Sequence, residues 1–259
     1  MQKQKLNPEL SRLLTIDLET ETIFGIIGRM ESLTDIFHKN SEYNHLIPFL
    51  KTYKAVTQGV EDHLTLEKNF YNNPRQMEKL DVYFASLYFF PLKQYLETGS
   101  EKSPWKVYFD FCESGPNIPF VQLLLGINAH INADLYTTLL KLDYIESEDF
   151  EKVNSILSEL IPGIMSYLAF EEKDIYGLGG MVLKNLYANE FKNIIVRWST
   201  DAWYNYKKSK EQGVDHTQKI REQTEILADQ IVILWQELLT KPSSTLKFLA
   251  NLENLSVRL

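Results

Sequence analysis

The 259-residue chain has very little cysteine, glycine or proline, and almost none of the strict apolar–polar alternation that marks β-strands. Its single cysteine, Cys112, excludes an intramolecular disulfide and is typical of a protein from a reducing compartment. The 11 glycines and nine prolines form no low-complexity linker. A chain of this length can bury a sizeable core without a disulfide or a metal. These absences favour one helical domain over residues 1–259, with residues 1–20 as a loosely packed N-terminal arm.

Other absences concern partners and location. The net charge is −8 and the basic residues are scattered, so we expect no nucleic-acid partner. No apolar stretch follows the first lysines, so we expect no secretory signal and a cytoplasmic location. The longest apolar run, residues 118–142, contains Asn128, His130, Asn132 and Asp134, each of which would be costly in hydrocarbon. It therefore predicts a buried helix and no membrane span.

Apolar residues recur at three- and four-residue spacing along nearly the whole chain. This pattern predicts an all-α protein, a bundle whose short connections favour antiparallel neighbours. Asn73-Pro74 and Ser103-Pro104 each place a capping side chain before a proline in a first helical turn. The stretch Gly177-Leu178-Gly179-Gly180 predicts a flexible connection. The expected helices cover residues 21–38, 42–66, 74–97, 103–113, 118–143, 147–170, 180–211, 215–240 and 243–256.

The helix at 118–143 is apolar around its circumference, which predicts a central helix wrapped by the others. Its polar side chains should then be buried too. His130 and Asp134 are four residues apart and share one face, while Asn128 and Asn132 share a second face. An unsatisfied buried polar group costs about 1–3 kcal/mol, and an unpaired charge costs more. These residues therefore require either a polar network or a wet cavity.

Three interpretations of these residues are open. The network can be structural and fix only the register of the helices. Alternatively, His130 and Asp134 can bind a divalent metal, although they supply only two ligands. In the third interpretation Asp134 orients His130, which acts as a general base in a pocket.

A catalytic site would need a carboxylate from another helix as well. Asp81 is the best candidate, because Glu78 lies near a helix start, where solvated acids are favoured. The candidate catalytic residues are thus His130, Asp134 and Asp81. Asn128, Asn132 and Tyr53 are candidate substrate-binding residues.

A second unusual segment is Arg197-Trp198-Ser199-Thr200-Asp201-Ala202-Trp203-Tyr204. Arg197 and Asp201 are four apart and can pair on one helix face. The tryptophans can simply be core residues. Alternatively, Arg197 belongs to the network of His130 and clamps Asp134 with its guanidinium group. Arg197 and Trp203 are therefore further candidate substrate-binding residues.

Several segments, in this order along the chain, resemble a bacterial family known only as domain of unknown function 5995. The most specific is Gly126-Ile127-Asn128-Ala129-His130-Ile131-Asn132-Ala133-Asp134-Leu135, in which Ile127 stands where the family commonly has methionine. The resemblance implies an α-helical protein, nominates Asp81, Asn128, His130 and Asp134, and implies no activity. The other segments are Arg29-Met30-Glu31, Tyr53-x-x-Val56-Thr57, Leu80-Asp81-x-x-Phe84-Ala85, Pro104-Trp105, Asp149-Phe150-x-x-Val153-Asn154 and Ala202-Trp203.

Two functions from different classes fit these observations. One is a small-molecule enzyme, metal-dependent or acid–base, with a small apolar substrate suited to the 12% aromatic content. The other is a non-catalytic helical binding or interaction module whose buried network is structural. In an enzyme the polar residues should line a cavity and keep unfilled hydrogen-bonding capacity. In a binding module they should be fully satisfied.

Overall fold

The computed structural model describes residues 6–99, 104–143, 145–171, 173–240, 251 and 255–259, with side chains for all of these except 165–187 and 238–240. Within these ranges the chain is helical and has no strand, so the all-α prediction is confirmed. The helices are α1 (Pro8–Leu13), α2 (Ile23–Lys39), the 3₁₀ helix η1 (Ser41–Leu46), α3 (Ile47–Leu66), α4 (Pro74–Thr98), α5 (Lys106–Ser114), α6 (Pro119–Ile127), the π-helix η2 (Asn128–Leu135), α7 (Tyr136–Leu142), α8 (Ser147–Glu171), α9 (Lys173–Gln212) and α10 (Thr217–Thr240).

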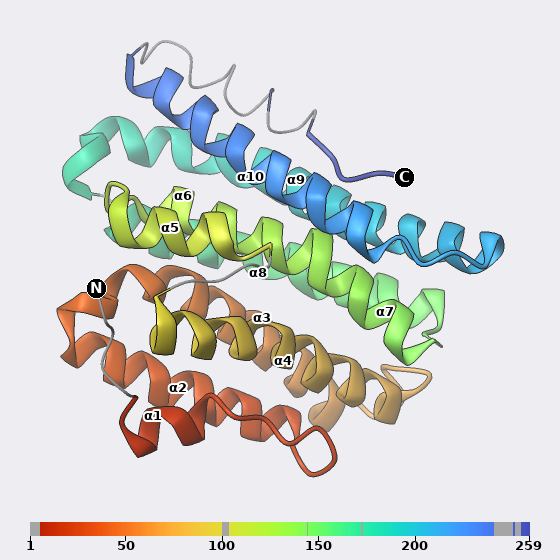
Figure 1. Cartoon of the computed structure of the whole chain (residues 1–259). Helices are drawn as coiled ribbons and strands as arrows, with labels where there is room; N and C mark the ends of the chain where they lie inside the picture. Colours follow the sequence, from red (N-terminus) through yellow and green to blue (C-terminus); the bar gives the residue numbers. More distant parts are fainter. Residues whose placement is uncertain (1–5, 100–103, 144, 172, 241–250, 252–254) are drawn as a thin grey trace.

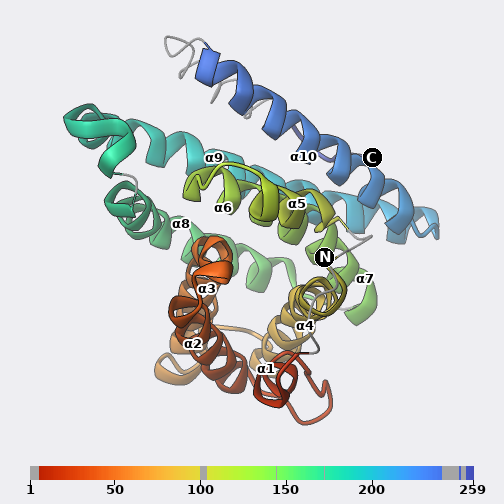
Figure 2. The ribbon, with the colours of Figure 1, turned by 60° about the vertical axis from the view of Figure 1, so that its left-hand side comes forward.

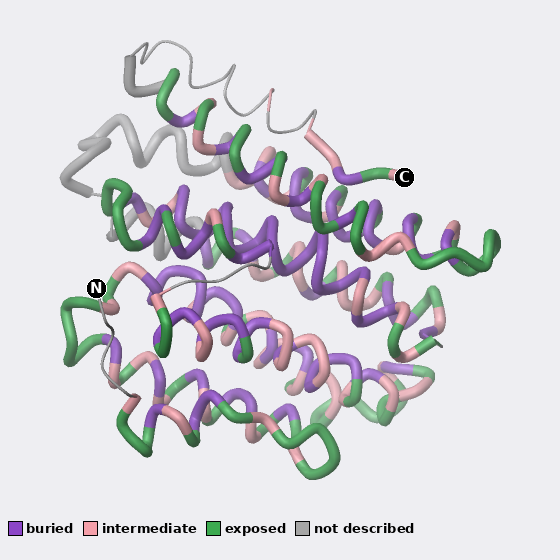
Figure 3. Tube along the Cα trace, in the orientation of Figure 1, coloured by how far each residue is buried: buried purple, intermediate pink, exposed green. Residues whose placement is uncertain are grey.

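The helices α6, η2 and α7 follow one another without a break and form the central rod of the molecule. Figures 1 and 2 show the α1–α4 group on one side of this rod and the long helices α9 and α10 on the other. The π-helix contacts α4, α9 and α10, and α6 contacts α3. The rod is also the part of the chain with the longest run of buried residues (Figure 3). The prediction of a buried central helix is therefore confirmed.

The structure differs from the expected helix boundaries in two places. The glycine stretch at residues 177–180 was expected to be a connection, but it lies inside α9, whose hydrogen bonds continue through it. The N-terminal arm is not loose throughout, because residues 8–13 form α1 and bury Leu10 and Leu13. The helix expected at 243–256 and the cap Ser103 lie largely or wholly outside the described residues. No helix in the described ranges is long and apolar enough to cross a membrane.

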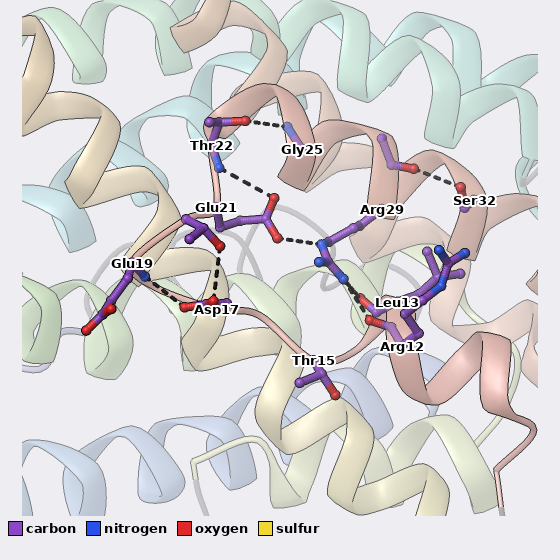
Figure 4. Close-up of polar contacts among 12 residues, drawn as sticks. Arg12, Leu13, Thr15, Asp17, Glu19, Glu21, Thr22, Gly25, Arg29 and Ser32 are labelled. Carbon is purple, nitrogen blue, oxygen red and sulfur yellow. Dashed lines mark hydrogen bonds and ion pairs between the residues drawn. The ribbon is translucent and has the colours of Figure 1, made fainter.

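Arg29 fastens α1 to α2 (Figure 4). Its Nη1 donates to the carbonyl oxygens of Arg12 and Leu13, at 2.8 and 3.0 Å, at the end of α1. Its Nε donates to Glu21 Oε2 at 2.7 Å. The last carbonyls of a helix have no partner within the helix. The Arg29 side chain supplies that partner, which explains why α1 packs against the bundle.

Two contacts place α4, the helix that carries Asp81. Asn73 caps the helix by accepting from the amide of Gln76 at 3.1 Å, as the sequence predicts. The buried carboxylate of Asp149, in the first turn of α8, accepts from the backbone amides of Asn72 and Asn73 at 2.7 and 2.9 Å. The start of α4 is thus held by α8 as well as by its own cap.

The segment Asn128–Leu135 was expected to be α-helical but forms a π-helix, whose backbone hydrogen bonds run from residue i to i+5. A change of helix type shifts the pairing of backbone carbonyls, so some lose an α-helical donor. The hydroxyl groups of Thr137 and Thr138 donate to the carbonyl oxygens of Ala133 and Asp134, both at 2.8 Å. These bonds support the return to α-helix in α7. Long π-helices are rare, and π turns occur frequently at functional sites.

Gly126 allows the aromatic ring of Phe49 to lie directly against the rod. A Cβ atom at this position would lie 2.4 Å from Cδ2 of Phe49. The ring is also enclosed by Tyr88, Trp105 and Tyr108 at centroid distances of 4.9 to 5.9 Å, so it has little room to move.

We therefore expect Gly126→Ala to lower the free energy of unfolding by about 1–3 kcal/mol because of overpacking. The matched control is Gly28→Ala in α2, where nothing lies within 4 Å of the added Cβ. Removing a helical glycine there should raise the free energy of unfolding by up to about 1 kcal/mol. Urea titration of both variants measures the two effects. The same sign for both variants would contradict the close approach at Gly126.

Candidate functional site

The site is built around the pair His130 and Asp134 in the π-helix. Nδ1 of His130 lies 3.1 Å from Oδ2 of Asp134, and both side chains are buried. The indole Nε1–H of Trp105, which precedes α5, donates to the same carboxylate oxygen at 2.9 Å. A tryptophan N–H can only donate. Oδ2 of Asp134 therefore accepts a hydrogen bond from Trp105 and also faces Nδ1 of His130. The carboxylate thus holds the orientation of the imidazole ring through that nitrogen.

Aromatic rings enclose the imidazole of His130. The ring of Phe84 stacks on it with a centroid distance of 3.6 Å and an angle of 10°. Tyr53 meets it edge-on at 4.4 Å. Phe49 and Trp105 lie at 5.8 and 5.7 Å. These contacts come from α3, α4 and the start of α5, and they leave the His130 ring 4% exposed. The second ring nitrogen, Nε2, is buried and has no hydrogen-bond partner.

Oδ2 of Asp81 is also buried without a hydrogen-bond partner. The hydroxyls of Tyr53 and Thr57 are buried as well and have no partner other than each other. The hydroxyl of Tyr71, in the connection before α4, is buried without a partner. Buried polar groups in native proteins are normally paired, and each exception requires an explanation. The structure buries Asp81, which is 6% exposed.

Burial shifts the pKa values of several of these groups. Burial raises the pKa of Asp81 to about 7. Burial also raises the pKa of Tyr53 well above its ordinary value, and the charges of Asp81 and Asp134 add to that rise. The two carboxylates thus act on one hydroxyl group from different helices. Burial and the charge of Asp81 likewise raise the pKa of Tyr71. These effects show that Tyr53, Tyr71 and both carboxylates belong to one electrostatic neighbourhood.

Burial lowers the pKa of His130 well below its ordinary value, and it raises the pKa of Asp134 well above its ordinary value. The hydrogen bond from Trp105 and the charge of Arg221 oppose the rise at Asp134. In the deprotonated pair, Nδ1–H of His130 donates to the carboxylate and Nε2 has a free electron pair. Nε2 is therefore the ring nitrogen that can accept a proton.

The second polar pair of the π-helix connects helices. Nδ2 of Asn128 donates to the carbonyl oxygen of Thr224 in α10 at 3.0 Å, and Nδ2 of Asn132 donates to Oδ1 of Asn128 at 2.9 Å. Oδ1 of Asn132 has no partner and is buried. The amide of Asn128 is thus committed to holding α10 against the rod. Only Asn132 retains hydrogen-bonding capacity that a ligand could use.

The structure places Arg197 and Trp203 apart from His130 and Asp134. Arg197 lies 3.9 Å from Asp201, which confirms their pairing on α9. The partners of Asp134 are His130 and Trp105, so the expected arginine clamp on Asp134 is wrong. Trp203 stacks on Phe150 of α8 at 4.5 Å and packs α8 against α9.

The sequence did not indicate that Trp105 donates a hydrogen bond to Asp134. Nor did it indicate that the charge of Arg221 opposes the rise in the pKa of Asp134. Trp105 occurs in the Pro104-Trp105 pair that carries part of the family resemblance, but nothing local links it to Asp134. Arg221 is an exposed residue of α10, and its charge also opposes the rise that burial causes in the pKa of Tyr83 on α4. Only the packing of α5 and α10 on the π-helix brings these groups together.

A metal would have to use His130 and Asp134 differently from how they lie. Within the described residues, no group of three or more His, Cys, Asp and Glu side chains is placed to hold a metal ion. Nδ1 of His130 and Oδ2 of Asp134 face each other at hydrogen-bond distance. A metal ligated by this histidine would therefore bind Nε2, or would have to replace that bond.

Comparison with known proteins gives one result. Residues 23–242 match a family described as Family of unknown function (DUF5995). This match extends on both sides of the segments that carry the resemblance. No curated protein and no solved structure matches the chain. The match covers most of the 259 residues and includes α4, the π-helix and α10. The chain belongs to the Family of unknown function (DUF5995).

Proposed function

We propose that this protein is an enzyme that moves a proton on a small, mainly apolar molecule. The proposal depends on Nε2 of His130, which is buried and has no hydrogen-bond partner, while Nδ1 of the same ring lies against Asp134. A buried polar atom without a partner costs about 1–3 kcal/mol. Such a cost within a rare π-helix is understandable if the atom acts on a ligand.

Each residue has a role in this proposal. His130 accepts or delivers the proton at Nε2, and Asp134 holds the ring and balances its charge, as carboxylates do for catalytic histidines. Asp81 changes protonation near neutral pH, so it can serve as the second acid–base group. The hydroxyl of Tyr53 has free hydrogen-bonding capacity for a polar group of the substrate. Phe49 and Phe84 supply apolar walls.

The test is a screen of small apolar ketones, esters and alcohols with the purified full-length protein in D₂O. Mass spectrometry detects deuterium uptake by proton exchange and mass changes caused by hydrolysis. We expect His130→Gln to lose turnover by at least about 100-fold, the usual contribution of a general base. The matched control is His63→Gln, because His63 lies on α3, pairs with Glu67 and lies outside the site. Equal turnover of both variants and wild type would contradict the role of His130.

A non-catalytic binding module is the second candidate. The bond from Asn128 to Thr224 favours it, because that half of the polar rod is structural. The same screen separates the candidates. Compounds that raise the melting temperature of wild type but not of His130→Gln, without being converted, would support a binding module. Conversion that depends on His130 would support the enzyme.

A metal-dependent form of the enzyme would have His130 and Asp134 as two protein ligands, with the metal replacing the hydrogen bond between Nδ1 of His130 and the carboxylate. Elemental analysis of wild type, His130→Gln and His63→Gln distinguishes it from pure acid–base chemistry. Stoichiometric metal in wild type and the control, lost in His130→Gln, would favour the metal. We also propose that the protein acts in a bacterial cytoplasm. Its only cysteine, Cys112, is a buried free thiol, as suits a reducing compartment.

A further inference from the structure

The residues Leu255–Leu259 lie along α9 and are held there by hydrogen bonds to their backbone. Trp198 Nε1–H donates to the carbonyl oxygen of Leu255 at 3.0 Å. Lys208 Nζ donates to the carbonyl oxygen of Leu259 at 2.9 Å. Trp198 and Lys208 lie ten positions, or about 15 Å, apart along α9, and both contact the segment. The segment therefore runs in an extended form along this side of α9.

Asn205 binds the same segment from the middle of that face. Its Nδ2 donates to the carbonyl oxygen of Val257 at 2.6 Å, and its Oδ1 accepts from the amide of Leu259 at 2.9 Å. One side-chain amide therefore satisfies the backbone on both sides of Arg258. This is the bonding that a neighbouring β-strand would supply to an extended peptide. Asn205 is fully buried, so its amide has no solvent to replace these bonds.

Two side chains of the segment make specific contacts with the rest of the protein. Val257 is 1% exposed and lies in the core. Arg258 lies over the ring of Tyr204 at 4.2 Å, and its Nε is 3.7 Å from Oδ1 of Asp201. The Asp201 side chain is only 5% exposed, whereas that of Arg258 is 55% exposed. A buried carboxylate and an aromatic face together favour an arginine at this position.

We propose that this face of α9 is a peptide-binding site, formed by Trp198, Asp201, Tyr204, Asn205 and Lys208. Its ligand is an extended segment with an aliphatic residue followed by arginine and a second aliphatic residue. Residues 255–259 of the chain occupy the site in cis. The site gives a role to the Asp201–Tyr204 part of the segment that sequence analysis singled out, which the acid–base site does not use. Its hydrogen bonds all go to backbone atoms, so another segment of the same pattern can replace the chain's own.

The experiment uses the full chain and a fluorescent, amidated peptide Leu-Ser-Val-Arg-Leu. The docked segment is displaced by Arg258→Glu, which sets a like charge beside Asp201 without entering the core. A tethered segment competes at an effective concentration in the millimolar range. Fluorescence anisotropy should therefore show the peptide binding to the Arg258→Glu chain at least about 10-fold more tightly than to wild type.

Two controls make the result specific. Adding Asn205→Ala to the Arg258→Glu chain should abolish binding, because both backbone contacts are lost. A peptide with glutamate in place of its arginine should bind at least about 10-fold more weakly to the Arg258→Glu chain, because it loses the aromatic and acidic contacts. Val257→Asp is a second way to displace the docked segment and should also expose the site. Failure of the peptide to bind either displaced chain, with far-UV circular dichroism unchanged, would overturn the proposal. So would equal binding with and without Asn205.

Discussion

Replacing Asp81 with asparagine should stabilise the protein at pH 8 and leave its stability at pH 4 nearly unchanged. Asp81 has a pKa of about 7 in the folded chain against an ordinary value of 3.8. Between these values the folded chain keeps a proton that the unfolded chain has lost, so the free energy of unfolding falls as the pH rises. Above pH 7 the loss is complete and amounts to at most about 4 kcal/mol. Asparagine cannot ionise and avoids this loss.

The measurement is the melting temperature of wild type and Asp81→Asn from pH 4 to pH 8.5. Because other groups titrate in both chains, the difference between the two curves isolates Asp81. We expect the difference to grow through pH 5–7 and then level off at several degrees. The control is Glu78→Gln, three residues earlier on the same helix but half-buried. A constant difference between wild type and Asp81→Asn across the range would contradict the burial of an uncompensated carboxyl group.

Asp134→Ala should have a large effect in the opposite direction. This change removes the acceptor that lies against the Nε1–H of Trp105 and the Nδ1 of His130, both of which are buried. Leaving a buried polar group without its hydrogen bond costs about 1–3 kcal/mol. We therefore expect a fall in the free energy of unfolding of this size, measured by urea titration at pH 7.

Asp110→Ala is the matched control for Asp134→Ala. Asp110 also pairs with a residue four positions away, Lys106, but both side chains are about half exposed. Exposed pairs contribute little, so the control should be nearly neutral. A small effect of Asp134→Ala, similar to that of Asp110→Ala, would show that solvent reaches the His130 pair and that its network is loose.

The two aspartate substitutions are expected to change the stability of the protein in opposite directions. This difference distinguishes a residue that supports the fold from one that is kept for function. Burial raises the pKa of both aspartates, but Asp134 has hydrogen-bond partners, whereas Asp81 has an unpartnered oxygen. Proteins keep such unfavourable groups mainly at sites that act on a ligand. The stability measurements therefore bear on the site even before a substrate is found.

Much of this arrangement follows from the sequence. The apolar period is strong enough to predict the helices, and a helix that is apolar all round must be central, so the burial of His130 and Asp134 could be predicted. Their pairing could be predicted too, because it depends only on a separation of four residues.

The rest depends on contacts that no local pattern encodes. Trp105 and Asp134 are joined by a bond across 29 residues, and Asn128 and Thr224 by one across 96. The π-helix packs against α4, α9 and α10, and its local sequence does not distinguish it from an α-helix. The glycines at 177–180 favour a break, but α9 continues through them.

The state of His130 is the most direct test of the proposed site. Long-range ¹H–¹⁵N spectra, with His130→Gln used to assign the signal among the five histidines, report which ring nitrogen carries a proton. At pH 8 we predict a protonated Nδ1 and an unprotonated Nε2. We also predict no imidazolium on lowering the pH through 6.5, because burial lowers the pKa of this ring. A protonated Nε2 at pH 8, or an imidazolium that forms near pH 6.5, would contradict the role of His130 as a buried base.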